Sequence, residues 1–169
     1  EEISKNTLDR LDIELTEETS IQTLHSLFTD NEAYGPNVLR KMHHYTQLAA
    51  QIAQDGDFDV IHAHDWITFP AGMRIKEITG KPLVLHVHSL ETDRAGENTR
   101  NEIYNLEKVA MLTADRIISV SQFTKNQIQD HYGIDPMKIS VVHNGIAQGN
   151  TSRKQHQLRD KLVVFLGRL

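Results

Sequence analysis

Cysteine is absent from this sequence of 169 residues, and its absence excludes disulfide bonds, cysteine-based zinc sites and thiol catalysis. Long apolar runs are absent too, because no stretch approaches the roughly 20 residues that a membrane helix needs. The first four residues, Glu1 to Ser4, lack the basic-then-apolar pattern of a signal peptide. We therefore expect no integral membrane segment and a cytoplasmic location.

A surplus of charge of one sign is also missing. The chain has 18 basic and 23 acidic residues, a formal net charge of -5, and no long run of either sign. This balance gives no electrostatic footprint for nucleic acid or for an anionic membrane surface. The length and the 38% hydrophobic content are enough for about one domain with one core.

From residue 36 onward, short apolar segments alternate with amphipathic ones. A helix is predicted from Pro36 to just before Gly56, because apolar residues recur there at helical spacing. Four strands follow in the prediction, at 58–64, 83–87, 116–120 and 139–142. The helices between them are predicted at about 68–79, 101–112 and 122–132, with a loop at 89–96. This order predicts an α/β fold, a Rossmann-like parallel sheet with helices on both faces.

Polar residues follow each predicted strand at its carboxyl end. In an open parallel sheet these ends share one edge, and ligands bind there. The residues concerned are His64 and Asp65, His88, Ser121, and Asn144. The sequence therefore predicts a substrate site along one edge of the sheet.

Structural roles compete with binding roles at several of these positions. Asp65 and Ser121 occupy places where helix N-caps are expected, and a cap is the simpler role for Ser121. Asn144 and Gly145 would also suit a turn, because both residue types tolerate a positive φ. Trp66 is expected to pack in the core rather than to stack on a sugar.

The histidines form two His-x-His pairs, His62 with His64 and His86 with His88. His62 and His86 are expected to make buried structural hydrogen bonds. A rival interpretation is a zinc or other transition-metal site for hydrolysis, with Asp65 nearby. Against it, imidazoles on a strand that is buried on both faces would need a polar layer beneath the helices.

Four blocks of sequence resemble, in the same order, the strand-and-loop blocks of one enzyme family. They are FDVIHAHDW (58–66), KPLVLHVHS (81–89), ADRIISVSQFTKNQI (114–128) and KISVVHNGI (138–146). The chain thus resembles the retaining GT-B glycosyltransferases of the glycogen synthase and sucrose-phosphate synthase type, the glycosyl transferase group 1 enzymes. The resemblance implies transfer of a hexosyl unit from a UDP- or ADP-sugar to an acceptor hydroxyl with retention. The nucleotide sugar is a substrate, and no cofactor or metal is implied.

The resemblance also assigns roles to individual residues. His88 corresponds to the histidine that contacts the donor sugar and the reaction centre. Asp65 matches a position that faces the acceptor, and Asn144 matches one that lines the interdomain crevice; His64, at the same strand end, is also expected to bind substrate. Arg168 matches the arginine that binds the donor diphosphate, where a guanidinium suits a leaving group of growing negative charge.

The expected domain organisation is a partial acceptor-side domain over 1–146, a polar linker over 147–160, and the first strand of a donor-binding domain over 161–169. The family's nucleotide-holding lysine and glutamate pair would follow Leu169, and its glycine-rich loop would precede Glu1. Such a chain is expected to be inactive alone, since donor binding needs two domains. The alternative without catalysis is a module that only holds an acceptor or a partner.

Overall fold

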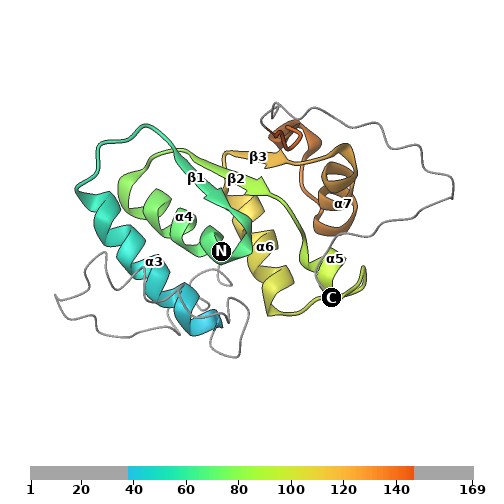
Figure 1. Cartoon of the computed structure of the whole chain (residues 1–169), viewed down its shortest axis with the longest axis horizontal. Coiled ribbons are helices and arrows are strands. Elements are labelled where there is room, and N and C mark those ends of the chain that lie inside the picture. Colours follow the sequence, from blue (N-terminus) through green and yellow to red (C-terminus); the bar gives the residue numbers. More distant parts are fainter. Residues whose placement is uncertain (1–37, 147–169) are drawn as a thin grey trace, which may run out of the picture.

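The computed structural model describes residues 38–146, so the expectations for 1–37 and 147–169 lie outside the described residues. The described part alternates strands and helices along the chain (Figure 1). Its elements are α3 (Val38–Gln54), β1 (Ile61–His64), α4 (Asp65–Thr79), β2 (Leu83–Val87), α5 (Glu91–Ala95), α6 (Glu102–Thr113), β3 (Arg116–Ser119), α7 (Gln122–Tyr132), the 3-10 helix η2 (Pro136–Lys138) and β4 (Ile139–Val141).

The four strands form one sheet in the order β1-β2-β3-β4, and every neighbouring pair is parallel. The register aligns Ala63 with Leu85, Leu85 with Ile117, and Ile117 with Ile139. This row of small and branched apolar side chains runs across the sheet and is buried throughout. The predicted α/β class and the predicted parallel sheet are therefore confirmed.

The two faces of the sheet differ in burial. Alternate residues are buried in β1, and Leu83, Leu85 and Val87 are fully buried in β2. The intervening residues on the opposite face are exposed or half-buried, among them His62, His64 and His86. The strand order follows the chain order, so each crossover connects a strand to the next strand in the same direction across the sheet. Right-handed crossovers that all run in one direction place their helices on the same face. The helical cover expected on the second face does not lie within 38–146.

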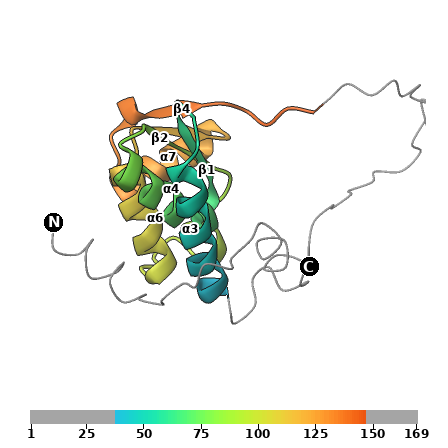
Figure 2. The ribbon, with the colours of Figure 1, turned by 90° about the vertical axis from the view of Figure 1, so that its left-hand side faces the viewer.

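The helices of the covered face pack side by side (Figure 2). α4 lies between α3 and α6 and packs on β1 and β2. Its Gly72 faces the sheet so closely that an added Cβ would lie 2.9 Å from a methyl of Leu83 and 3.0 Å from the Cβ of Ala63. A glycine in the middle of this helix is therefore needed for close packing.

Most boundaries agree with the prediction to within a few residues. α4 begins at Asp65, earlier than the predicted start near 68, and α5 occupies part of the segment predicted as a loop. Ser121 caps α7 as predicted, because its side chain accepts a hydrogen bond from the Thr124 amide. α7 ends at Tyr132, and the residue that follows it, Gly133, has a φ of 70°, the left-handed conformation that glycine adopts without strain.

A buried carboxylate network lies beneath the segment that follows β2. We give this name to Glu91, Arg94, Asn101, Glu107 and Tyr132. Glu107, only 1% exposed, accepts hydrogen bonds from the Glu91 amide at 2.9 Å, from Arg94 Nη2 at 2.7 Å and from the Tyr132 hydroxyl. Asn101 Nδ2 donates to Glu91 Oε1 at 2.7 Å. The network ties α5 to α6 and α7.

Candidate functional site

The carboxyl ends of β1 and β2 bring three of the predicted site residues together. Asp65 Oδ1 accepts hydrogen bonds from the backbone amide of His88 at 2.7 Å and from that of Ser89 at 3.4 Å. The ring nitrogens His64 Nδ1 and His88 Nε2 are 3.1 Å apart. Asp65 thus fixes the backbone at His88, and His64 contacts its ring.

Asp65 adopts an unusual backbone conformation, with a φ of 57°. It is the only non-glycine residue with a positive φ among 38–146. The position of Asp65 in the sequence suggested that its side chain would cap α4. The side chain instead reaches across to the end of β2. No side chain caps α4, and the Thr68 hydroxyl in its first turn donates to the His64 carbonyl oxygen at 2.6 Å. A strained residue with a cross-strand hydrogen bond is typical of functional sites.

Four imidazole rings lie in contact on the open face of the sheet and at its edge. The ring centroids of His62 and His86 are 5.5 Å apart, those of His64 and His86 4.9 Å, and those of His86 and His88 4.3 Å. His62 is exposed, and neither ring nitrogen of His86 has a hydrogen-bond partner within the described part of the chain. The expectation of buried structural hydrogen bonds for His62 and His86 was therefore wrong.

The surroundings of these two histidines disfavour the imidazolium form. Burial lowers the pKa of His62, and the neighbouring His64 and His88 lower it further. Burial also lowers the pKa of His86, with additional lowering by His88, His64 and His62. Positive charges would repel one another in such a cluster. These surroundings favour the neutral form of His62 and His86, which carries a lone pair on one ring nitrogen.

The segment after His88 is held at its far end by residues that the sequence interpretation did not select. Arg94 Nη1 donates to Ser89 Oγ at 2.8 Å, and Arg94 Nε donates to Glu91 Oε2 at 2.9 Å. Burial raises the pKa of the Glu107 carboxyl, against the opposing hydrogen bonds from Tyr132, the Glu91 amide and Arg94. One available signal was the position of Glu107 on the apolar side of α6, three residues from both Tyr104 and Ala110.

The other predicted residues are spread along the same edge of the sheet. Ser121 caps α7 beyond β3, and the exposed Asn144 lies three residues past the end of β4. β4 lies two strands from β2, so these strand ends are separated by about 10 Å, given a spacing of 4.7–4.9 Å between strands. His143 Nδ1 lies 3.1 Å from the Val120 carbonyl oxygen, linking the ends of β4 and β3. Arg168 lies outside the described residues.

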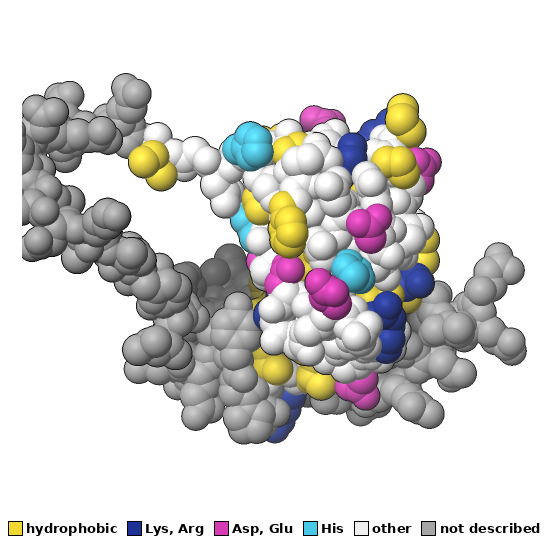
Figure 3. Space-filling view, turned by 90° about the vertical axis from the view of Figure 1, so that its right-hand side faces the viewer, with side chains coloured by type: hydrophobic (Ala, Val, Ile, Leu, Met, Phe, Trp, Pro, Cys, Tyr) yellow, Lys and Arg dark blue, Asp and Glu magenta, His cyan; other side chains and the backbone are white. Residues whose placement is uncertain are grey.

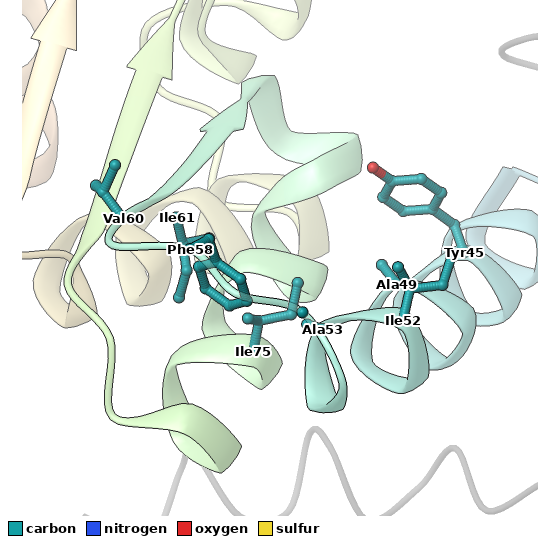
Figure 4. Close-up of a pocket in the computed structure, with 9 residues that line it drawn as sticks. Tyr45, Ala49, Ile52, Ala53, Phe58, Val60, Ile61 and Ile75 are labelled. Carbon is teal, nitrogen blue, oxygen red and sulfur yellow. The ribbon is translucent and has the colours of Figure 1, made fainter.

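A pocket of about 360 Å³ opens at the opposite end of β1 (Figure 4). Its wall is formed by α3, the α3–β1 connection and α4, and it includes Ile52, Phe58, Val60 and Ile75. The lining is almost entirely apolar, whereas a ligand site needs a few polar groups that fix orientation. We therefore place the candidate site at the carboxyl edge and not in this pocket.

The charged surface agrees with the balanced composition. On the face shown in Figure 3, acidic and basic side chains of the described residues are interspersed, and histidine side chains reach the surface.

No helix within 38–146 is long and apolar enough to cross a membrane.

Comparison with protein families gives the class to which this fold and site belong. The model of Glycosyltransferase Family 4 matches residues 11–148, and the chain belongs to this family. The match includes every strand of the sheet and every predicted site residue except Arg168. Membership confirms sugar transfer as the general activity of the family.

Individual relatives are similar over part of their length. An uncharacterized glycosyltransferase of Methanocaldococcus jannaschii is 28% identical over 128 residues, 66% of this chain and 33% of the relative. D-inositol 3-phosphate glycosyltransferases of Salinispora arenicola and Gordonia bronchialis are 29% and 30% identical, over 68% and 72% of this chain. Each of those two matches covers 30% of the relative, so the chain spans about a third of the length of these relatives.

Proposed function

We propose that the chain forms most of the acceptor-side domain of a retaining GT-B glycosyltransferase of the glycogen synthase and sucrose-phosphate synthase type. The enzyme would move a hexosyl unit from a UDP- or ADP-sugar to an acceptor hydroxyl in the cytoplasm, without a metal or cofactor. The observation that carries the proposal is His88, held at the carboxyl edge by Asp65 and in ring contact with His64.

The placement of His88 suits a role at the reacting sugar. Its backbone is fixed by a charged acceptor, while its exposed ring extends beyond β2 at the edge where ligands of parallel sheets bind. A positioned imidazole can donate a hydrogen bond to a sugar hydroxyl or stabilise charge that develops in the transition state. Contact with His64 limits the rotation of this ring, so the N–H group of His88 is oriented before substrate binds.

The rest of the edge would hold the acceptor and complete the cleft. Asp65, His64, Asn144 and Ser121, in addition to its capping role, would bind the acceptor along this edge, and Arg168 would bind the donor diphosphate. We further propose that 147–160 is a linker and that a donor-binding domain begins near 161. The chain covers only about a third of each relative, which leaves room for such a second domain in them. D-inositol 3-phosphate is the first acceptor to test, because several relatives bear that name.

The test compares His88→Ala with wild type in the longest natural polypeptide that contains this chain, assayed for transfer from UDP- and ADP-glucose. Loss of one preorganised hydrogen-bond donor lowers turnover by roughly 100-fold or more. His131→Ala on α7 is the matched control and should retain wild-type turnover. Turnover of His88→Ala near that of wild type would remove His88 from the reaction centre.

Two rivals give different results. The first rival, metal-dependent hydrolysis at the histidine cluster, predicts that a chelator abolishes activity. Our proposal predicts that transfer persists after metal removal. A module that only binds an acceptor predicts no turnover in the long polypeptide. Calorimetry on the 169-residue chain separates the cases further, since tight nucleotide binding by this chain would contradict the two-domain proposal.

A further inference from the structure

We propose that His62, His64 and His86 form a binding site for a divalent transition-metal cation, with Zn²⁺ as the representative ion. The site lies on the face of the sheet opposite the described helices. Occupation of this site does not depend on the transfer reaction proposed above, and the cation is not a participant in that reaction.

The strand register creates the site. His64 lies directly opposite His86 in the parallel pairing of β1 and β2, and His62 lies two residues before His64 on the same face. Each side chain contributes one ring nitrogen, and the three nitrogens lie within 4.8 Å of one another. Three nitrogens bound to one zinc ion at 2.0–2.1 Å lie roughly 3.3 Å apart. Small rotations of the rings therefore suffice to close the site.

His86 supplies a second, independent observation. Both of its ring nitrogens are buried, and neither has a hydrogen-bond partner within residues 38–146. A buried polar atom without a partner destabilises the folded state, so such an atom in a native structure points to a missing water or ion. A cation that also contacts His62 and His64 would satisfy one of these nitrogens at the position where the three rings converge.

His64 also contacts a histidine outside the group of three, His88. Its Nδ1 lies 3.1 Å from His88 Nε2, and donation from Nδ1 would leave the lone pair of Nε2 for the cation. Histidines that bind metals usually hold their second nitrogen in a hydrogen bond, most often to a carboxylate, a backbone carbonyl or water, and here His88 would take that place. His88 would thus orient His64 from outside the group of three ligands.

The accessibility of the face removes the main physical objection to a metal here. His62 and His64 are exposed, so a hydrated cation reaches them without passing through the core. Three imidazole nitrogens as ligands favour Zn²⁺, Ni²⁺, Co²⁺ or Cu²⁺ over Mg²⁺ and Ca²⁺, which prefer oxygen ligands. Because His64 also contacts His88, an ion at this site would alter the orientation of the His88 ring and slow any reaction there.

The test is a Zn²⁺ titration of the full 169-residue chain by calorimetry, after removal of metal with a chelator and dialysis. We expect saturable binding of one ion per chain, and Co²⁺ should give the visible absorption of a four-coordinate complex. His62→Ala and His86→Ala should each weaken Zn²⁺ binding at least tenfold. Mg²⁺ at the same concentrations should give no saturable binding.

The control is the double variant His131→Ala/His143→Ala, which removes two histidines away from the site and should bind Zn²⁺ within twofold of wild type. Absence of one-to-one binding, or unchanged affinity in His62→Ala, would overturn the proposal. His62 is exposed, so this variant decides the matter even if His86→Ala fails to fold by circular dichroism. The zinc titration does not decide whether His88 acts in transfer, which the His88→Ala assay tests separately.

Discussion

Asp65 and Glu107 do the same chemical task in two different environments. Each carboxylate accepts hydrogen bonds from backbone amides in the short segment that follows β2, Asp65 at His88 and Ser89 and Glu107 at Glu91. Asp65 lies partly exposed at the edge of the sheet, whereas Glu107 is 1% exposed in the core. The segment that carries His88 is therefore fixed at both ends.

The difference in burial predicts a different role for each carboxylate. A buried carboxylate with charged and neutral donors is costly to disrupt, because removal of one partner leaves the others without compensation. An exposed carboxylate exchanges its partners for water at small cost, so its main effect is on local geometry. We expect Glu107 to control stability and Asp65 to control the orientation of His88.

The largest effect is expected from Glu107→Ala. It leaves Arg94, Tyr132 and the Glu91 amide without their common acceptor, and we expect a loss of about 3–5 kcal/mol in the free energy of unfolding. Urea denaturation measures this loss. Glu102→Ala, at the exposed start of the same helix, is the control and should cost less than about 1 kcal/mol. Equal losses in Glu107→Ala and Glu102→Ala would show that the burial of Glu107 does not set its contribution to stability.

A smaller effect on stability and a larger one on turnover are expected from Asp65→Ala. The variant loses the acceptor for the His88 amide and keeps a positive φ that alanine tolerates poorly. Asp65→Gly removes the same carboxylate but relieves the backbone strain. We expect Asp65→Gly to be more stable than Asp65→Ala by about 1–2 kcal/mol. We expect both variants to lose turnover to a similar extent, on the order of tenfold or more.

Wild-type transfer in Asp65→Gly would show that the carboxylate does not position His88. The same assay used for His88→Ala measures this, so the two variants can be compared in one background.

The smallest effect is expected from a third carboxylate, Asp115, which accepts from the Leu83 amide at the other end of β2 at 2.6 Å. The hydrogen bond from Lys76, followed by that from the Leu83 amide, lowers the pKa of Asp115. A lowered pKa stabilises the fold above the unfolded value of about 3.9, and this stabilisation is lost as pH falls through the folded value.

Asp115→Asn should therefore cost less than about 1 kcal/mol at pH 7, because the Asp115 side chain is 45% exposed and solvent screens its charge. The difference from wild type should disappear in acid below the folded pKa. Thermal unfolding followed between pH 2 and 7 measures the difference in stability at pH 7 and its disappearance in acid. A difference that grows as pH falls would contradict this role.

The sequence by itself determined the element order, because apolar periodicity and the glycines that end helices are local signals. The position of Ser121 as a cap was also readable from its neighbours alone. The identity of the edge that carries polar residues followed from the parallel topology, since parallel strands share one direction. The segment 91–95 escaped prediction as a helix because its first residue is held by a distant group, Glu107.

Only the tertiary structure decided which polar residues meet. Register across β1 and β2 places His64 opposite His86 and brings Asp65 to His88, residues that are more than 20 positions apart in the chain. The burial of Glu107 and the exposure of His62 were likewise set by which side of the sheet the helices cover. Hydrophobic periodicity reports that a face exists, whereas long-range packing decides what lies against it.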